Sequence, residues 1–272
     1  MSHYPFGSGI VSKYLGVSRQ LFDIDFAQSV LAPITLPPTM SKANATTIQG
    51  IFNRIAPQYD ALNEWISLGQ HRIWKKMAVK WSGVTSGDRV LDVCCGSGDL
   101  TLLLAKTVGI YGQTIGLDFA TQQLAIAAKK QARTCPHLDI HWQEGDALHL
   151  PYPENHFDGI TMGYGLRNVV DIPRALGELQ RVLKPGKKVA ILDFHRPEDP
   201  SKQVFQQWYL NHFVVPLAEQ FQLTHEYAYI QPSIERFPSG KEQEKLAKAT
   251  GFREAVHYGI VGDMMGVLVA IK

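Results

Sequence analysis

The stretch from Val90 to Leu100, Val-Leu-Asp-Val-Cys-Cys-Gly-Ser-Gly-Asp-Leu, constrains the fold more than any other part of this chain. Its first residues are typical of a buried strand, and Gly96 and Gly98 then lead into an apolar helical pattern. Glycines are favoured there because the chain must turn sharply and a ligand can approach the backbone closely. The stretch therefore predicts an α/β fold with a ligand above the carboxyl ends of its strands.

Further along, short apolar runs alternate with helical patterns, which predicts a Rossmann-like, doubly wound and mostly parallel seven-stranded sheet with helices on both faces. Gly262 and Asp263 separate the last two runs as in a hairpin, so we expect the last strand to be antiparallel. The expected strands are Arg89–Val93, Gln113–Asp118, Asp139–Glu144, Phe157–Gly163, Lys188–Phe194, Ala255–Val261 and Met265–Ile271. The expected helices are Gly98–Val108, Ala120–Thr134, Asp171–Leu183 and Lys241–Thr250.

The expected organisation is an extension over residues 1–43 followed by one domain over 44–272, with N-terminal helices at 44–82 and a helical, aromatic-rich lid at 201–240. Pro33, Pro37 and Pro38 interrupt the extension, and Met40 follows them. Two interpretations of the extension stay open: translation starts at Met40, or the segment serves targeting or docking.

The composition excludes several classes of protein. The net charge is +2 for 272 residues, and no basic block is interleaved with aromatic residues, so a nucleic acid partner is not expected. No apolar run is long enough to span a membrane. The three cysteines do not form a disulfide framework, and we expect the adjacent Cys94 and Cys95 to fill small spaces beneath the glycine loop. Without H-E-x-x-H or C-x-x-C spacing, no metal is indicated.

Acidic residues stand at the ends of successive expected strands. Asp118 ends the second strand, where a carboxylate accepts hydrogen bonds from both hydroxyls of a ribose. Asp146 follows the third strand, at a place that suits a contact to adenine, and Asp92 lies in the first strand. Together with Gly96 and Gly98, these acids predict a ligand that contains adenosine.

A dinucleotide is the main competitor for this site, and three features oppose it. Thr101 replaces the third glycine of G-x-G-x-x-G. Asp99 lies at the start of the helix, where it would repel a pyrophosphate, and Asp92 adds a second negative charge below the loop. Acids at these places suit a ligand with an ammonium and a sulfonium group, which S-adenosylmethionine has.

Several longer motifs are shared with one enzyme family. They are Phe52-Asn-Arg-Ile-Ala-Pro-Gln-Tyr-Asp60, Gly69-Gln-His-Arg-Ile-Trp-Lys75, Asp92-Val-Cys-Cys-Gly-Ser-Gly-Asp99, Gly163-Tyr-Gly-Leu-Arg-Asn-Val169 and Arg181-Val-Leu-Lys-Pro-Gly186. Through them, residues 48–272 resemble the ubiquinone/menaquinone biosynthesis C-methyltransferases, which have the class I S-adenosylmethionine methyltransferase fold. Cys94-Cys95-Gly96-Ser97, Met162-Gly-Tyr164 and Asp193-Phe-His-Arg-Pro197 are most similar to the photosynthetic branch.

The resemblance implies methyl transfer from S-adenosylmethionine to a ring carbon of 2-phytyl-1,4-naphthoquinol, which gives phylloquinol in the last step of phylloquinone biosynthesis. It also implies cofactor contacts from Ser97, Asp118, Asp146 and Ala147. Three alternatives stay open: methylation of demethylmenaquinol, methylation of a benzoquinol, and a non-catalytic scaffold subunit that binds the cofactor. A homodimer, a peripheral membrane contact through the lid, and a cyanobacterial cytoplasmic or plastid location also stay open.

The reacting ring must be a quinol, because its carbon becomes nucleophilic when the neighbouring hydroxyl loses its proton, whereas the oxidised quinone is electrophilic. Arg167 and Asn168 follow the fourth strand, where a guanidinium can stabilise a phenolate and hold a water as base, with Tyr59 and His71 near. The candidates for the base itself are His71, Tyr59, Asp60 and His195, and we favour the water. The structural alternatives are a surface ion pair for Arg167, capping and packing of the N-terminal helices for Tyr59 and Asp60, and a structural role for His71.

Overall fold

A computed structural model describes residues 49–50, 53–54, 56, 59–67, 69–220 and 230–272, without the side chains of residues 59–62, 218 and 220. The expected extension over 1–43, most of 44–58 and the aromatic residues from 221 to 229 lie outside this description. None of the described helices is both long enough and apolar enough to pass through a bilayer.

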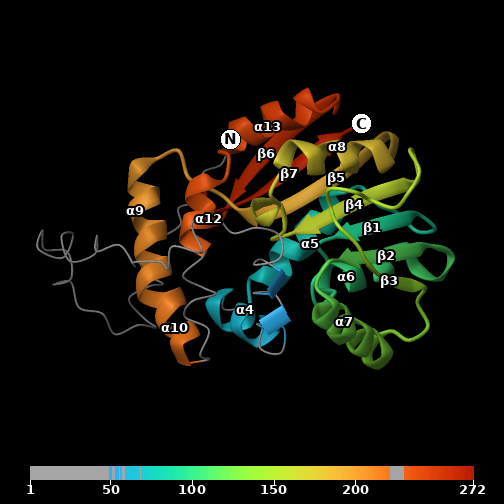
Figure 1. Ribbon diagram of the computed structural model, residues 1–272, viewed down its shortest axis with the longest axis horizontal. Coiled ribbons are helices and arrows are strands. Elements are labelled where there is room, and N and C mark those ends of the chain that lie inside the picture. The colour runs from blue at the N-terminus through green and yellow to red at the C-terminus, as the bar shows by residue number, and fades with distance from the viewer. Residues whose placement is uncertain (1–48, 51–52, 55, 57–58, 68, 221–229) are drawn as a thin grey trace, which may run out of the picture. The chain divides into compact units, whose positions relative to one another are not determined.

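In the described part of the chain, seven strands form one sheet in the order β3-β2-β1-β4-β5-β7-β6 (Figure 1). The strands are β1 (Arg89–Val93), β2 (Gln113–Asp118), β3 (Ile140–Glu144), β4 (Phe157–Gly163), β5 (Leu183–Phe194), β6 (Glu254–Ile260) and β7 (Met265–Ile271). Strands β1 to β5 pair in parallel, and β7 pairs antiparallel with both β5 and β6. The predicted doubly wound sheet with an antiparallel last strand is confirmed.

Helices cover both faces of this sheet. On one face, α5 (His71–Trp81) and α6 (Asp99–Val108) pack on the central strands, and α7 (Thr121–Thr134) lies beside β2 and β3. On the other face lie α8 (Ile172–Val182) and α13 (Gly240–Ala249). The central strand β1 shows why this layering forms, since Val90 packs toward α5 and α6 while Leu91 and Val93 pack toward α8. A parallel strand covered on both sides must be apolar on both sides.

Strand β5 begins earlier than the sequence pattern predicts, at Leu183 instead of Lys188, and α8 ends at Val182. The pairing of β4 with β5 explains the difference. Phe157 pairs with Leu183, and the register then shifts before Gly159 pairs with Lys188. This irregularity absorbs Pro185 and Gly186, so residues that predict the end of one element lie inside the next.

The expected lid over 201–240 is built from separate helical pieces. They are α9 (Pro200–Tyr209), a π-helical turn at Leu210–Val214, α10 (Val215–Gln220) and α12 (Ile230–Arg236). Leu210, Val214 and Ile234 form a small core of their own, against which Ile66 of α4 (Tyr59–Ser67) packs. The hydroxyl of Tyr209 also donates a hydrogen bond to the carbonyl oxygen of Ile66, so the lid is attached to the N-terminal helices (Figure 1).

Candidate active site

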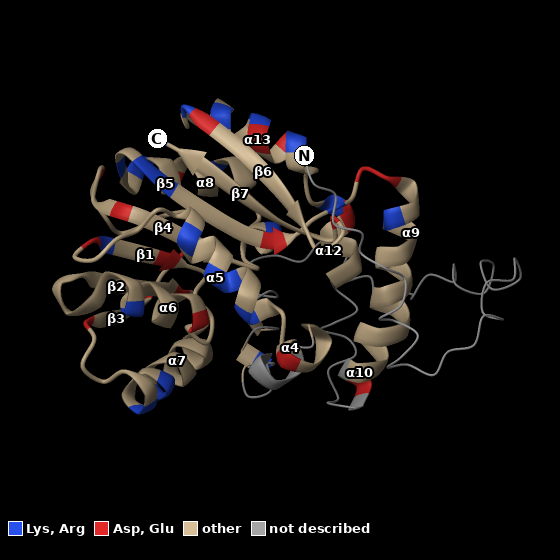
Figure 2. Cartoon of the chain, turned by 180° about the vertical axis from the view of Figure 1, so that it is seen from behind, with Lys and Arg blue, Asp and Glu red and all other residues tan. Residues whose placement is uncertain are grey.

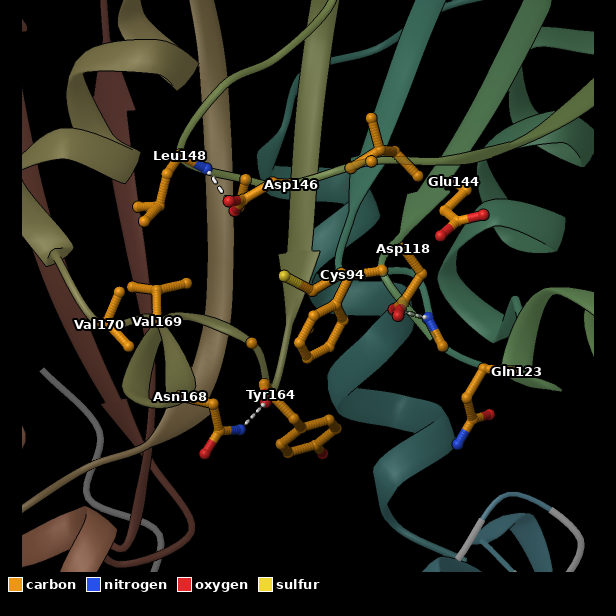
Figure 3. Close-up of a pocket in the computed structure, with 17 residues that line it drawn as sticks. Cys94, Asp118, Gln123, Glu144, Asp146, Leu148, Tyr164, Asn168, Val169 and Val170 are labelled. Carbon is orange, nitrogen blue, oxygen red and sulfur yellow. Dashed lines mark hydrogen bonds between the residues drawn. The ribbon is translucent and has the colours of Figure 1, made fainter. Parts of the chain in front are cut away.

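A cavity of about 330 Å³ lies at the carboxyl ends of the central strands. Its wall brings together five residues predicted from the sequence, of which Figure 3 labels Asp118, Asp146 and Asn168. They are Gly96, Asp118, Asp146, Ala147 and Asn168. The volume falls in the range of ordinary cofactor and substrate sites. The cavity therefore lies at the edge of the sheet where the sequence predicts a ligand.

The glycine loop after β1 uses its two glycines differently. Gly96 has φ 54° and lies on the cavity wall, where its backbone is open to a ligand. Gly98 has φ 84° and faces the interior, where a Cβ atom would stand 2.5 Å from the ring of Trp142 and 2.9 Å from Cβ of Ala127. Gly98, predicted as a cofactor contact, is therefore required by the packing of the loop against β3 and α7.

Asp118 is the carboxylate that connects β2 to the glycine loop. One oxygen accepts a hydrogen bond from the backbone N–H of Gly96 at 2.8 Å, and the other accepts from the N–H of Ala120 at 2.8 Å. Burial raises the pKa of Asp118, and the hydrogen bonds from Ala120 and Gly96 oppose that rise. Asp118 also lines the cavity, where a carboxylate suits acceptance of hydroxyl protons from a ribose.

The β3 end supplies a second acidic side of the cavity. Asp146 is exposed and accepts a hydrogen bond from the N–H of Leu148 at 2.9 Å, which closes the turn after the strand. Ala147 is buried beside it, and Glu144 also lines the cavity. This turn therefore presents a small apolar surface with backbone polar groups, which fits the flat ring of a nucleobase.

Asp92 lies beneath the loop and does not line the cavity. It is fully buried and accepts hydrogen bonds from the hydroxyls of Thr101 at 2.6 Å and Thr161 at 2.7 Å. Burial raises its pKa to about 7, although both hydroxyls favour the charged form. The expectation that Asp92 binds the cofactor stays a prediction, and its observed contacts join β1 to α6 and β4.

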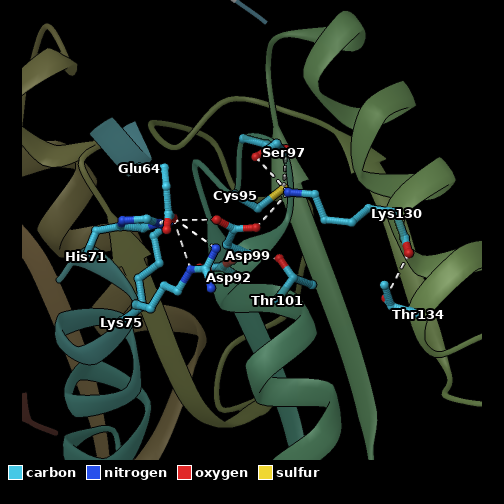
Figure 4. A network of polar contacts seen from close by, with 12 residues as sticks. Glu64, His71, Lys75, Asp92, Cys95, Ser97, Asp99, Thr101, Lys130 and Thr134 are labelled. Carbon is cyan, nitrogen blue, oxygen red and sulfur yellow. Dashed lines mark hydrogen bonds and ion pairs between the residues drawn. The ribbon is translucent and has the colours of Figure 1, made fainter. Parts of the chain in front are cut away.

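The structure corrects the interpretation of Asp99 as an open negative charge at the start of the helix. Nζ of Lys75 lies 2.7 Å from one of its oxygens and Nζ of Lys130 lies 2.6 Å from the other (Figure 4). Burial alone would raise the pKa of Asp99, but the two ammonium groups outweigh it and lower the pKa to about 2. Because two lysines balance this carboxylate, its charge is no argument against a pyrophosphate or for a sulfonium.

Ser97 and His71 lie around the same network and not on the cavity wall. Ser97 is buried, and its hydroxyl oxygen accepts from Nζ of Lys130 at 3.3 Å. His71 is buried at the start of α5, with Nδ1 2.7 Å from the hydroxyl of Ser67, and burial lowers its pKa (Figure 4). These contacts favour the structural alternative for His71. Tyr59 and Asp60 begin α4, but their side chains lie outside the described residues.

Arg167 lies just behind the cavity wall, in a buried ion pair with Asp193. Its Nη1 donates to the Asp193 carboxylate and, at 3.2 Å, to the carbonyl oxygen of Tyr164, while its guanidinium carbon lies 5.0 Å from the centre of the Phe194 ring. The structural alternative of a surface ion pair for Arg167 is wrong, because both side chains are more than nine-tenths buried. Nε of Arg167 is buried and, among the described residues, makes no hydrogen bond.

Asn168 stands beside Arg167 in the same 3₁₀ turn, Leu166–Asn168, and does line the cavity. Its Nδ2 donates to the carbonyl oxygen of Tyr164 at 3.0 Å, as Figure 3 shows. One of the two N–H groups that could stabilise an oxyanion is therefore already bound to the backbone. The role of Asn168 in holding a phenolate stays a prediction, which rests on the second N–H of Nδ2, while Oδ1 adds an acceptor.

The sequence interpretation missed Cys94 as a wall residue. Cys94 has φ 54° and lines the cavity beside Gly165, where a Cβ atom would stand 2.5 Å from Cβ of Cys94. Burial, with nearby carboxylates of which Asp118 is the strongest, raises its pKa well above the ordinary value, so the thiol stays protonated. No pattern in the sequence signals this, because it depends on a positive φ at a residue other than glycine.

His195, another candidate base, lies away from the cavity. Its Nε2 is 3.3 Å from a carboxylate oxygen of Asp263, its ring centre is 4.5 Å from that of His257, and burial lowers its pKa. Gln206 of α9 donates to the carbonyl oxygens of both His195 and Met264. His195 thus contributes to the attachment of the lid to β5 and β7.

Comparison with known sequences gives a consistent family. The model of the ubiE/COQ5 methyltransferase family matches residues 40–272. A 2-phytyl-1,4-naphtoquinone methyltransferase from Synechocystis sp. is 60% identical over 233 residues, which are 86% of this chain and 98% of that protein. The chloroplastic 2-phytyl-1,4-beta-naphthoquinone methyltransferase from Arabidopsis thaliana is 48% identical over 256 residues, covering 89% of this chain and 98% of that protein.

Comparison with solved structures gives the fold. A SAM-dependent methyltransferase from Aquifex aeolicus has a TM-score of 0.54 at 22% identity and covers 72% of this chain and 88% of its own. The cyclase SpnF has a TM-score of 0.55 at 19% identity and covers 89% of this chain and 98% of its own. A cyclase among these neighbours shows that the fold by itself does not fix the reaction.

Proposed function

Since the chain belongs to the ubiE/COQ5 methyltransferase family, we propose that it transfers the methyl group of S-adenosylmethionine to a ring carbon of 2-phytyl-1,4-naphthoquinol and so produces phylloquinol. The observation that carries this substrate is the 60% identity over 98% of a relative named for the corresponding quinone. The more distant alternatives, demethylmenaquinol and a benzoquinol, differ in the tail and in the ring. A panel of these quinols tests the choice.

The cavity has features that fit S-adenosylmethionine. Asp118 binds the ribose hydroxyls, Asp146 and Ala147 border the adenine, and the open backbone at Gly96 accepts the amino acid part. When bound, S-adenosylmethionine supplies a methyl group on a positively charged sulfur. The positive φ at Gly96 supports a ligand at this wall, because the glycine backbone can be approached closely: the nearest atom to an added Cβ would be Oε1 of Gln123 at 4.0 Å.

Arg167 acts at the reacting ring through a donor that the ion pair leaves unused. The buried ion pair with Asp193 holds the guanidinium still, and Nε, which has no partner among the described residues, donates to the phenolate oxygen or to a water that removes the phenolic proton. A donor that is fixed before the reaction stabilises the developing negative charge without reorganising. Tyr59 and His71 stay candidates for a supporting role near the water that removes the phenolic proton.

The first prediction concerns the redox state of the substrate. With S-adenosylmethionine carrying a labelled methyl group, we expect labelled product from the dithionite-reduced naphthoquinone and none from the oxidised form, because only the quinol ring carbon becomes nucleophilic. Radioactivity in the organic extract measures the product. Equal labelling of both forms would contradict the proposed chemistry, and no labelling of any quinol in the panel would contradict the enzyme itself.

We also propose a peripheral membrane contact through α9 and the π-helical turn. Val204, Phe205 and Phe213 are about half exposed, and Trp208 stacks with Phe205 at 5.9 Å between ring centres. Figure 2 shows few charged residues along α9 and α10, where Lys202 and Glu219 are the charges of residues 200–220. Such a face suits the acyl boundary of a bilayer, in which a phytylated substrate dissolves.

The second prediction tests this face. Exchange of Phe205 and Phe213 for serine is expected to weaken binding to phospholipid vesicles about tenfold or more, since each buried ring contributes roughly 1.5–3 kcal/mol. Co-sedimentation with vesicles measures the binding. Ile110 and Tyr111, exposed beside β2, give the matched control when exchanged for serine, and this variant should keep its binding. Equal losses in both variants would argue against a specific contact.

A further inference from the structure

The amide of Asn168 makes a hydrogen bond through Nδ2 and none through Oδ1 among the described residues. Asn168 is 9% exposed, and its Nδ2 donates to the carbonyl oxygen of Tyr164 at 3.0 Å. Its Oδ1 is buried and accepts no hydrogen bond from any residue that the structure describes. Asn168 is one of the residues that line the cavity (Figure 3), so a ligand bound there is the nearest source of a donor for this oxygen. A buried acceptor without a donor is unfavourable, so the site requires a ligand that donates.

The fold fixes which end of the amide is used. A carbonyl oxygen can only accept, so turning the amide over would bring two acceptors together at the Tyr164 carbonyl. Tyr164 in turn is held by its own N–H, which donates to the carbonyl oxygen of Leu192 at 2.7 Å, and by φ 58°. Asp193 accepts from the backbone N–H of Arg167 at 3.1 Å and so holds the turn that carries Asn168. The acceptor is therefore present before any substrate binds.

A reduced and an oxidised naphthoquinone differ at the ring oxygens, which are the atoms that would contact such an acceptor. The quinol presents a hydroxyl, which donates, whereas the quinone presents a carbonyl oxygen, which accepts. We propose that Oδ1 of Asn168 is a specificity-determining group that accepts a hydroxyl of the reduced ring and excludes the oxidised quinone. This inference rests on the proposed function and adds to it a means by which the oxidised form is kept from occupying the site.

The test measures two constants, KM for the reduced substrate and Ki for its oxidised form as inhibitor, under anaerobic conditions. In the wild type we expect Ki to exceed KM at least tenfold, because a site built to bind a hydroxyl rejects an analogue without one. In Asn168→Leu, which has a similar volume and no acceptor, KM should rise about fivefold and Ki should fall about tenfold. A Ki equal to KM in the wild type, or a Leu variant in which both constants change by the same factor, would overturn the inference.

Two further measurements distinguish a contact to the substrate from a contact to the cofactor and from a failure to fold. Calorimetry with S-adenosylmethionine should give the same affinity for the wild type and Asn168→Leu, and a loss of about tenfold or more would assign the acceptor to the cofactor and overturn the inference. Asn168→Ala, which also removes the acceptor and adds no bulk, is measured in the same way in case the leucine variant does not fold, and the same changes in KM and Ki are expected. If the wild type methylates quinols but the ratio of Ki to KM is the same in Asn168→Leu as in the wild type, this inference alone is contradicted. If the wild type methylates no quinol at all, the proposed function is contradicted.

Discussion

Replacement of Arg167 by alanine is expected to lower the free energy of unfolding by about 3–5 kcal/mol and methyl transfer by about 10²-fold or more. The stability loss arises because Asp193 is 3% exposed and would keep a buried charge without its partner. The activity loss arises because the guanidinium donor that we propose for the reacting ring disappears. Urea denaturation and initial rates at saturating cofactor measure the two effects.

The double variant Arg167→Met with Asp193→Leu separates these effects. Both charges are then absent, so the cost of an unpaired buried carboxylate disappears, while the backbone N–H groups of Arg167 and Phe194 lose their acceptor. Part of the lost stability should therefore return, while methyl transfer should stay low. If activity returned with stability, Arg167 would only support the turn. Arg72→Ala gives the matched control, since Arg72 pairs with Glu64 at the surface and should contribute less than about 1 kcal/mol.

The positions of the strands could be predicted from the sequence, because apolar runs between glycines and polar turns determine them locally. The start of β5 could not, since Leu183 is placed by its pairing with Phe157. Gly96, Asp118 and Asp146 could also be predicted as neighbours. Parallel strands end at one edge of the sheet, so residues just after successive strands must meet there.

The charges of the site could not be predicted, because their partners are distant in the sequence. Asp99 is balanced by Lys75 from α5 and Lys130 from α7, and Arg167 is balanced by Asp193 at the end of β5. No periodicity connects these residues. The motif therefore indicated which side chains are present, but whether each charge is open to a ligand depends on the tertiary contacts.

Exchange of Asp118 for asparagine is expected to raise the Kd for S-adenosylmethionine about 100-fold, while the rate at saturating cofactor changes little. Both carboxylate oxygens accept backbone N–H groups, one from Gly96 and one from Ala120. An asparagine must turn its NH₂ group toward one of these N–H groups, so two donors face each other and the glycine loop loses its attachment to β2. It also loses an acceptor for the ribose.

Asp139→Asn is the matched control, because Asp139 precedes β3, is half exposed and pairs with His141 away from the cavity. Its Kd for S-adenosylmethionine should equal that of the wild type by calorimetry. The S-adenosylhomocysteine affinity should fall in Asp118→Asn by the same factor as that of S-adenosylmethionine, since the two ligands share the ribose. A selective loss for one of them would mean that Asp118 senses the sulfonium charge instead of the hydroxyls, because only the methyl group and its charge distinguish the two ligands.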